Sequence, residues 1–171
     1  RRRRGAEDPQ VGAAPPQGAS MIIRTAVPAD APALARLELV FPARQRWSET
    51  SWLEEIGADG RLVEVAETAP DGVIACASWR HAGNTADLDR IIVAGEHRRR
   101  GIAGRLLGRG IAWAAGQGAG NVLLEVASDN TAAIGFYAAN GFVPVNRRGN
   151  YYGRGVDAVV MGKRMKREES Q

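Results

Sequence analysis

Hydrophobic side chains recur along this chain with two different periods, and the period predicts which segments are strands and which are helices. Alternating or short apolar runs predict seven strands, at residues 21–24, 61–67, 72–79, 88–93, 121–126, 142–145 and 156–161. Apolar residues at every third or fourth position predict an amphipathic helix over residues 101–116. The run NVLLEV at 121–126 is almost wholly apolar, which is typical of a strand buried on both faces.

Three further helices are indicated by residues that favour helix ends. Asp30, followed by a proline two residues later, is expected to cap a helix over residues 31–37. Ser48 and Asn130 are expected to cap two more, and Gly141 to end the second of these. The resulting order, β-α-α-β-β-β-α-β-α-β-β, predicts a domain of the α/β (α+β) class.

Charge is distributed unevenly, with its excess at the two ends of the chain. The 171 residues include 23 Lys and Arg and 19 Asp and Glu, yet residues 21–162 carry equal numbers of each sign. Residues 1–20 are rich in Pro, Gly and Ala, so we expect a disordered extension there, a folded domain over 21–163 and a charged tail over 164–171. The basic excess therefore does not indicate a nucleic-acid-binding fold. A basic arm at 1–20 for an anionic partner stays open as the alternative.

Composition excludes several classes of protein. Cys76 is the only cysteine, which excludes a disulfide framework and a cysteine-rich zinc site. The apolar runs are shorter than the roughly 18 residues that a membrane span requires. The charged start has no apolar segment behind it, so no secretory signal is indicated. We expect a cytoplasmic protein with no metal and no membrane contact.

The segment with the clearest chemistry joins an apolar strand to the amphipathic helix. N–H groups at a helix start lack partners within the helix, and the helix dipole adds positive charge, so anions bind there. Small residues let a ligand approach the backbone, and arginines at 98, 99, 100, 105 and 109 add charge. The segment predicts a pyrophosphate site; the alternative is a glycine turn with solvated arginines. It reads Arg98-Arg99-Arg100-Gly101-Ile102-Ala103-Gly104.

This segment resembles the acyl-CoA pyrophosphate loop of the GCN5-related N-acetyltransferases (GNAT), [QR]xxGx[GA], with Arg98, Gly101 and Ala103 at the fixed positions. The spacing to Glu125 and Tyr137 resembles the RimI-type branch, the ribosomal-protein-alanine N-terminal acetyltransferases. The likeness covers about residues 21–163. It implies a mixed, mostly antiparallel sheet of about seven strands flanked by about four helices, with a splay between the fourth and fifth strands.

The resemblance also implies acetyl-CoA as co-substrate. Ile91, Ile92 and Val93 should offer backbone partners to the pantetheine arm, and one N–H there should act as an oxyanion donor. Arg98 to Gly104 should hold the pyrophosphate. Asn130 should contact the cofactor, although a plain helix cap is an equal alternative and both roles are compatible.

Two residues are implied to be catalytic. Glu125 is a charged side chain inside an apolar run, and a carboxylate taken out of water suits a general base. The alternatives are a solvent-facing residue or a structural ion pair with an arginine. Tyr137 is implied to protonate the leaving thiolate and to lie beside the cofactor. Its alternative is core packing, for which the adjacent Phe136 is the better candidate.

The implied function is an acetyl-CoA-dependent N-terminal protein acetyltransferase that transfers acetyl directly to an α-amine. The leading acceptor is the N-terminal alanine of a small-subunit ribosomal protein, without direct nucleic-acid contact, and the enzyme is expected to be a monomer or weak dimer. Two alternatives stay open: acetylation of a small-molecule amine, and a non-catalytic CoA-binding module. Residues 43–46 and Gly149 interrupt the branch's substrate-loop patterns, which leaves the peptide preference open. Asp87 and Asp89 are expected to be exposed strand charges, with binding of a basic substrate as the alternative.

Overall fold

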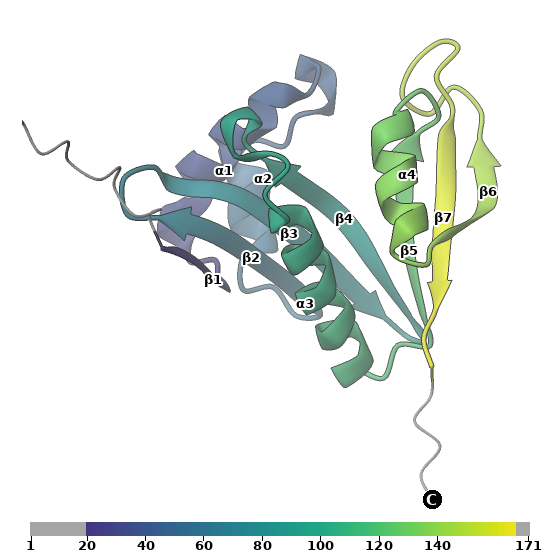
Figure 1. Ribbon diagram of the computed structural model, residues 1–171, viewed down its shortest axis with the longest axis horizontal. Coiled ribbons are helices and arrows are strands. Elements are labelled where there is room, and N and C mark those ends of the chain that lie inside the picture. The colour runs from purple at the N-terminus through teal and green to yellow at the C-terminus, as the bar shows by residue number, and fades with distance from the viewer. Residues whose placement is uncertain (1–19, 167–171) are drawn as a thin grey trace, which may run out of the picture.

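Within residues 20–166, seven strands form one sheet. The computed structural model describes residues 20–166, so most of the predicted N-terminal extension and the end of the predicted tail lie outside the described residues. The strands are β1 (Met21–Thr25), β2 (Arg61–Thr68), β3 (Gly72–Ala82), β4 (Thr85–Val93), β5 (Asn121–Ala127), β6 (Val143–Arg148) and β7 (Ala158–Arg164). They form one sheet in the order β1-β2-β3-β4-β5-β7-β6 (Figure 1). Among these seven described strands, only β4 and β5 pair in parallel.

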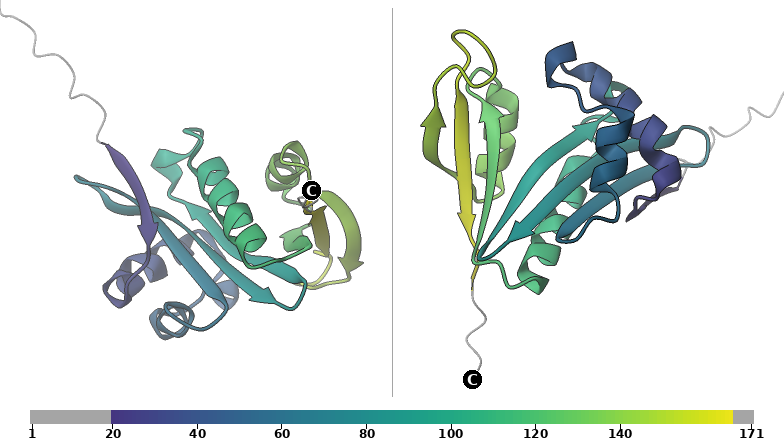
Figure 2. Two further views of the ribbon diagram at one scale, coloured as in Figure 1. Left: turned by 90° about the horizontal axis from the view of Figure 1, so that it is seen from below. Right: turned by 180° about the vertical axis from the view of Figure 1, so that it is seen from behind.

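Helices cover both faces of the sheet (Figures 1 and 2). They are α1 (Ala31–Leu37), α2 (Glu49–Glu55), α3 (Ile102–Gly116) and α4 (Thr131–Ala139), with short 3-10 turns η2 (Glu38–Val40) and η3 (Ala43–Gln45) between α1 and α2. Buried residues of α3 and α4 share one apolar cluster with the sheet, and those of α1 and α2 share another. Within residues 20–166, no helix is both long enough and apolar enough to cross a membrane.

The sheet opens between its two parallel strands. Pairing of β4 with β5 runs from Thr85 opposite Asn121 to Leu88 opposite Leu124, and both strands continue beyond that point without pairing to each other. On its other edge, β4 carries a bulge, because Leu88 pairs with Trp79 and Arg90 with Ser78. Such an extra residue bends a strand away from its neighbour. The predicted fold class and the predicted splay are both confirmed.

The helix caps differ in how well the sequence predicted them. Ser48 and Asn130 cap α2 and α4, each accepting a hydrogen bond of 3.1 Å from a first-turn N–H. Gly141 has a φ of 86°, the left-handed conformation expected after a helix. Asp30 does not cap α1 with its side chain. Its carboxylate instead accepts hydrogen bonds from Arg24 at 2.8 and 2.9 Å.

Several strand predictions need correction. β3 and β6 end three residues later than predicted, at Ala82 and Arg148, and β4 begins three residues earlier, at Thr85. β5 is buried on one face only. Every second residue of the strand is only partly buried, because these residues lie on the face of the sheet that carries α1 and α2, and the apolar cluster of those two helices does not extend to β5. The last strand begins at Ala158 rather than at residue 156 and continues through Arg164. The residues before it are drawn into a loop, where Asp157 accepts a hydrogen bond of 2.9 Å from the N–H of Asn150. Residues 164 and 165 therefore belong to the folded part of the chain, since the Met165 N–H bonds to Gly120.

Close packing of α3 on β3 leads to a stability prediction. A Cβ atom at Gly110 would lie 1.9 Å from Cε2 of the fully buried Trp79. Gly110→Ala is therefore expected to lower the free energy of unfolding by about 1–3 kcal/mol, because a packed core resists extra volume. Gly108, in the same helix, has no atom within 4 Å of its Cβ position, so Gly108→Ala should raise it by about 0.5–1 kcal/mol. Urea unfolding measures both; equal effects would contradict the packing argument.

Candidate active site

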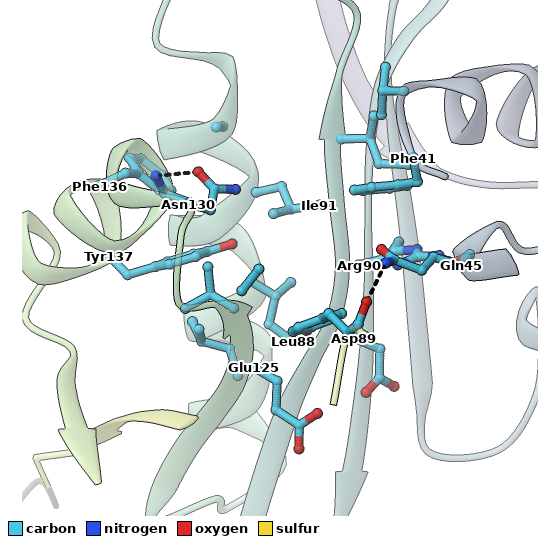
Figure 3. A pocket seen from close by; sticks show the side chains of 18 of the residues that line it. Phe41, Gln45, Leu88, Asp89, Arg90, Ile91, Glu125, Asn130, Phe136 and Tyr137 are labelled. Atoms are coloured by element: carbon cyan, nitrogen blue, oxygen red, sulfur yellow. Dashed lines mark hydrogen bonds between the residues drawn. The ribbon is translucent and has the colours of Figure 1, made fainter. Parts of the chain in front are cut away.

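A pocket of about 900 Å³ lies where β4 and β5 separate (Figure 3). On one face of the sheet it is lined by α4 and by Ala103 of α3. On the other it is lined by residues 40–45, Glu125 and Tyr152. The pocket thus connects the two faces of the sheet through the splay, and two molecules could meet inside it from opposite sides.

The open edge of β4 offers backbone groups to a ligand. Ile91 and Val93 pack with the α3 and α4 cluster, and Ile92 packs with the α1 and α2 cluster. Successive residues of a strand direct their N–H and C=O groups to alternate sides. Because the Ala94 N–H bonds to Ile74 of β3, the backbone groups of Ile91 and Val93 face away from β3, toward the splay. Among the three predicted partners, this alternation favours Ile91 and Val93.

The loop before α3 has the backbone conformation of an anion site. Arg99 and Gly101 both have positive φ, 62° and 75°, and Gly101 directly precedes the helix. Curled backbone of this kind gathers N–H groups around an anion, and the first turn of α3 adds N–H groups without partners in the helix. Arg98 and Ala103 line the pocket. The other predicted residues of the loop are neighbours of Arg98 and Ala103 in the chain but do not line the pocket: Arg99, Arg100, Gly101, Ile102 and Gly104.

The predicted cluster of five arginines is not fully assembled. Arg109 leaves it, because its guanidinium binds the carboxylate of Glu64 on β2 at 2.6 and 2.8 Å. Arg98 donates a hydrogen bond of 3.3 Å to the carbonyl of Val93, which ties the loop to the open strand edge. Arg100 lies 3.4 Å from Nδ1 of His97. The sequence could have predicted this, because Arg109 lies about two helical turns after the start of α3 and therefore away from the loop.

Glu125 lies one residue beyond the last pair of the β4–β5 ladder and lines the pocket. The prediction of a buried carboxylate needs correction, because its side chain is 26% exposed. One oxygen lies 3.1 Å from Nε of Arg148. Hydrogen bonding with Glu125 raises the pKa of Tyr151. The ion pair that the sequence left as an alternative is present, and Glu125 still lines the pocket.

Tyr137 enters the pocket from α4, and its hydroxyl points toward the splay (Figure 3). It is 7% exposed, and burial raises its pKa. Its ring packs against Phe136 and Phe142 at 5.3 and 5.9 Å between centroids. The expectation that Phe136 is the more buried of the two is wrong, because Phe136 is half-buried and lines the pocket. Asn130 both caps α4 and lines the pocket.

One wall of the pocket depends on an ion pair that sequence reasoning missed. Arg90 of β4 donates hydrogen bonds of 3.0 and 2.9 Å to the fully buried carboxylate of Glu38. The Arg90 guanidinium also bonds to the carbonyl of Gln45 and lies 4.4 and 4.9 Å from the ring centroids of Phe41 and Trp47. These contacts fix residues 38–47 against β4. The signal in the sequence was a charged residue inside an apolar strand.

Two further lining residues have shifted pKa values. Asp89 is the bulge residue of β4, and burial raises its pKa to about 6, although Arg61 and Arg80 lie 3.3 and 3.6 Å away. The expectation that Asp89 is an exposed strand charge is therefore wrong. Burial, followed by the charge of Glu125, raises the pKa of Tyr152 to about 12. Asp89 and Glu125 bring two carboxylates to this end of the pocket, and each of them already faces an arginine.

Residues 25–142 match the acetyltransferase (GNAT) family. The chain belongs to this family. Its fold is similar to that of the ribosomal-protein-S18-alanine N-acetyltransferase of Escherichia coli, with a TM-score of 0.76 and 27% identity, covering 89% of this chain and 99% of the other.

Two curated relatives are longer than the part they share with this chain. An uncharacterized protein of Mycobacterium leprae is 32% identical over 147 residues, which are 82% of this chain and 40% of the relative. The N-alpha-acetyltransferase 30 of Schizosaccharomyces pombe is 33% identical over 89 residues, 51% of this chain and 59% of the relative. The chain thus spans about half the length of the curated relatives it matches.

Proposed function

We propose that this protein is an acetyl-CoA-dependent N-terminal protein acetyltransferase. The observation that carries the proposal is the pocket through the splay, which brings Tyr137 from the α3 and α4 face and Glu125 from the opposite face into one cavity. Tyr137 would act on the leaving group, and Glu125 would act on the incoming amine. The leading acceptor is the N-terminal alanine of a small-subunit ribosomal protein.

The residues around the splay fit acetyl-CoA, which would supply an activated acetyl group as a thioester. The open backbone edge at Ile91 and Val93 would bind the amides of an extended pantetheine arm, as a neighbouring strand would. A backbone N–H there would donate to the thioester carbonyl oxygen. The loop from Arg98 to Gly104 would bind the pyrophosphate through N–H groups and arginines. Asn130 lies at the start of α4, on the same side of the pocket.

Glu125 would accept a proton from the incoming amine, directly or through a water molecule. An α-amino group has a pKa of roughly 7.7–8.0, against about 10.4 for a lysine side chain, so an N-terminus gives up its proton more readily at neutral pH. Arg148 would hold the carboxylate in place for this task.

Tyr137 would hold its proton while the thiolate leaves. Its raised pKa keeps the hydroxyl protonated. Because a thiolate is less basic than the Tyr137 phenolate, the hydroxyl would act chiefly by donating a hydrogen bond to the sulfur as negative charge develops there. Cys76 is not a nucleophile in this scheme, because its thiol is fully buried and burial raises its pKa. Transfer is therefore direct between the two bound substrates.

The choice of acceptor is supported by two of the similar proteins. The Escherichia coli structure is that of an enzyme acting on the alanine of ribosomal protein S18, and the Schizosaccharomyces pombe relative is an N-alpha-acetyltransferase. A free-thiol assay with acetyl-CoA and peptides beginning with Ala, Ser, Met or blocked Ala tests the proposal. Turnover that requires a free α-amine is expected. Activity on small amines alone would contradict it, and binding of CoA without turnover would indicate a non-catalytic module.

Arg99→Ala tests the proposed pyrophosphate site. The variant removes a positive charge from an exposed loop residue, and alanine keeps a Cβ at the same left-handed φ, so the backbone strain is unchanged and the fold should tolerate it. We expect the KM for acetyl-CoA to rise about 10-fold, since a charge-assisted hydrogen bond contributes about 1.5–3 kcal/mol, while kcat with saturating acetyl-CoA stays near wild type. Arg109→Ala is the matched control, because Arg109 binds Glu64 instead of the loop. Equal KM changes in both variants would remove Arg99 from the site.

A further inference from the structure

His97 lies between the loop proposed to bind the pyrophosphate and the turn that joins β2 to β3. It ends the 3-10 turn η4 (Gly95–His97), directly before the loop that begins at Arg98. Its imidazole is only 12% exposed and does not line the pocket. No step of the acetyl transfer described above uses this side chain, so its contacts have no role there as catalytic groups.

The two ring nitrogens of His97 meet groups of opposite kind. Nε2 lies 3.4 Å from the carboxylate of Asp71. That carboxylate belongs to the turn between β2 and β3, and the hydroxyl of Thr68 donates a hydrogen bond of 3.3 Å to the same oxygen. Nδ1 lies 3.4 Å from Nη1 of Arg100. His97 thus connects a turn of the sheet to an arginine of the loop.

The chemistry of these partners decides which ring nitrogen carries the hydrogen. A guanidinium can only donate hydrogen bonds, and an ionised carboxylate can only accept them. A neutral imidazole suits both partners when Nε2 carries the hydrogen toward Asp71 and Nδ1 accepts from Arg100. In this chain of contacts, Asp71 orients the ring and the ring orients the guanidinium.

The loop backbone is held by side-chain contacts on both sides of its left-handed residue. Arg99 has a φ of 62°, a conformation that non-glycine residues adopt rarely and at a cost. Directly before it, Arg98 donates a hydrogen bond of 3.3 Å to the carbonyl of Val93. Directly after it, Arg100 contacts His97. The two contacts therefore enclose the strained residue and support the shape of the loop.

We infer that His97, oriented by Asp71, positions Arg100 to bind the pyrophosphate of acetyl-CoA. The inference rests on the proposed function, because that function places the pyrophosphate in this loop. Arg100 is exposed, and an exposed arginine loses much side-chain freedom when a ligand binds it. A contact that orders the guanidinium beforehand removes part of that cost and tightens binding. His97 and Asp71 are therefore positioning residues, which act through Arg100.

Charge alone predicts the opposite result for Asp71. A carboxylate near an anion site repels the anion, so its neutralisation alone would tighten cofactor binding. Positioning predicts weaker binding, because the ring of His97 loses the partner that orients it. For Asp71→Asn we expect the Kd for CoA, measured by calorimetry, to rise about 3-fold. An unchanged or lower Kd would overturn the inference.

His97→Ala tests the inference with two acetyl donors. With acetyl-CoA we expect KM to rise about 5-fold, while kcat stays within about 2-fold of wild type. With S-acetyl-pantetheine, which has the thioester but no pyrophosphate, kcat/KM should stay within about 2-fold of wild type. An equal loss with both donors would show general damage to the fold and would overturn the inference.

Further variants locate the effect at Arg100. His81→Ala is the matched control, because the other histidine of the chain bonds to the carbonyl of Gly83 at 2.9 Å and should leave both constants unchanged. Arg100→Ala should raise the Kd for CoA about 10-fold. Adding His97→Ala to it should change Kd by less than about 2-fold, because the two residues act as a unit. The same factor for His97→Ala with and without Arg100 would overturn the inference.

Failure of the inference and failure of the proposed function give different results. Calorimetry with CoA measures cofactor binding without turnover. A Kd that is unchanged in His97→Ala, together with acetylation of an Ala-initiated peptide, would overturn the inference and leave the function in place. A Kd that rises as expected, without acetylation of any peptide, would overturn the function and leave His97 in its role at a CoA site.

Discussion

Glu125→Gln is expected to lower kcat by about 100-fold or more while the affinity for acetyl-CoA stays near wild type. The amide keeps the shape of the side chain and can still meet Arg148, but it cannot accept a proton from the incoming amine. Removal of a positioned general base typically costs a factor of 10² to 10⁴ in rate. Steady-state kinetics with a saturating Ala-initiated peptide measures kcat, and calorimetry with CoA measures cofactor binding.

A matched control is available on another strand. Glu67 of β2 also binds an arginine, since its carboxylate lies 3.0 Å from Arg24, but it does not line the pocket. Glu67→Gln should leave kcat unchanged. An unchanged kcat in Glu125→Gln would remove Glu125 from the mechanism. A large loss of CoA affinity in the same variant would show instead that the pocket had collapsed.

A second large effect is expected for Arg90→Met, which should lower the free energy of unfolding by about 3–5 kcal/mol. The variant leaves the carboxylate of Glu38 fully buried without its cationic partner, and breaking a buried pair from one side costs that much. The loss should also loosen residues 38–47, because the same guanidinium bonds to Gln45 and stacks on Phe41. Urea unfolding measures the stability.

The double variant Arg90→Met with Glu38→Leu distinguishes this explanation from a simple packing loss. Replacing both charges with apolar groups of similar size is often neutral, so the double variant should recover most of the lost stability. The KM for the acceptor should be raised in both variants, since the bond to Gln45 is absent from each. A double variant less stable than Arg90→Met would contradict the buried-charge explanation.

Periodicity and turn residues were sufficient for the order of the main elements, because each depends on local sequence. Ser48, Asn130 and Gly141 mark helix ends through contacts within four residues, and the structure has them as predicted. Asp30 has the same local signal but binds Arg24 of β1, a competition that no local rule includes. The start of β7 moved for a similar reason, since Asp157 is held in a loop by Asn150.

In the candidate site, too, the sequence predicted the local features and missed the contacts between residues far apart in the chain. Arg98, Ala103, Asn130 and Tyr137 all line the pocket and were found from one motif and its spacing. The ion pair of Arg90 with Glu38 spans 52 positions of the chain, and a charged residue in a strand does not reveal its partner.

The short ladder between β4 and β5 has a thermodynamic consequence. Beyond Leu88 and Leu124 each strand keeps one edge of amide and carbonyl groups that another strand would normally satisfy. The protein alone is therefore an incomplete sheet, and an extended amide-bearing ligand inside the splay would act as its missing strand. Folding and loading of such a sheet are linked equilibria, since a ligand that binds only the folded state adds its binding free energy to the stability of the fold.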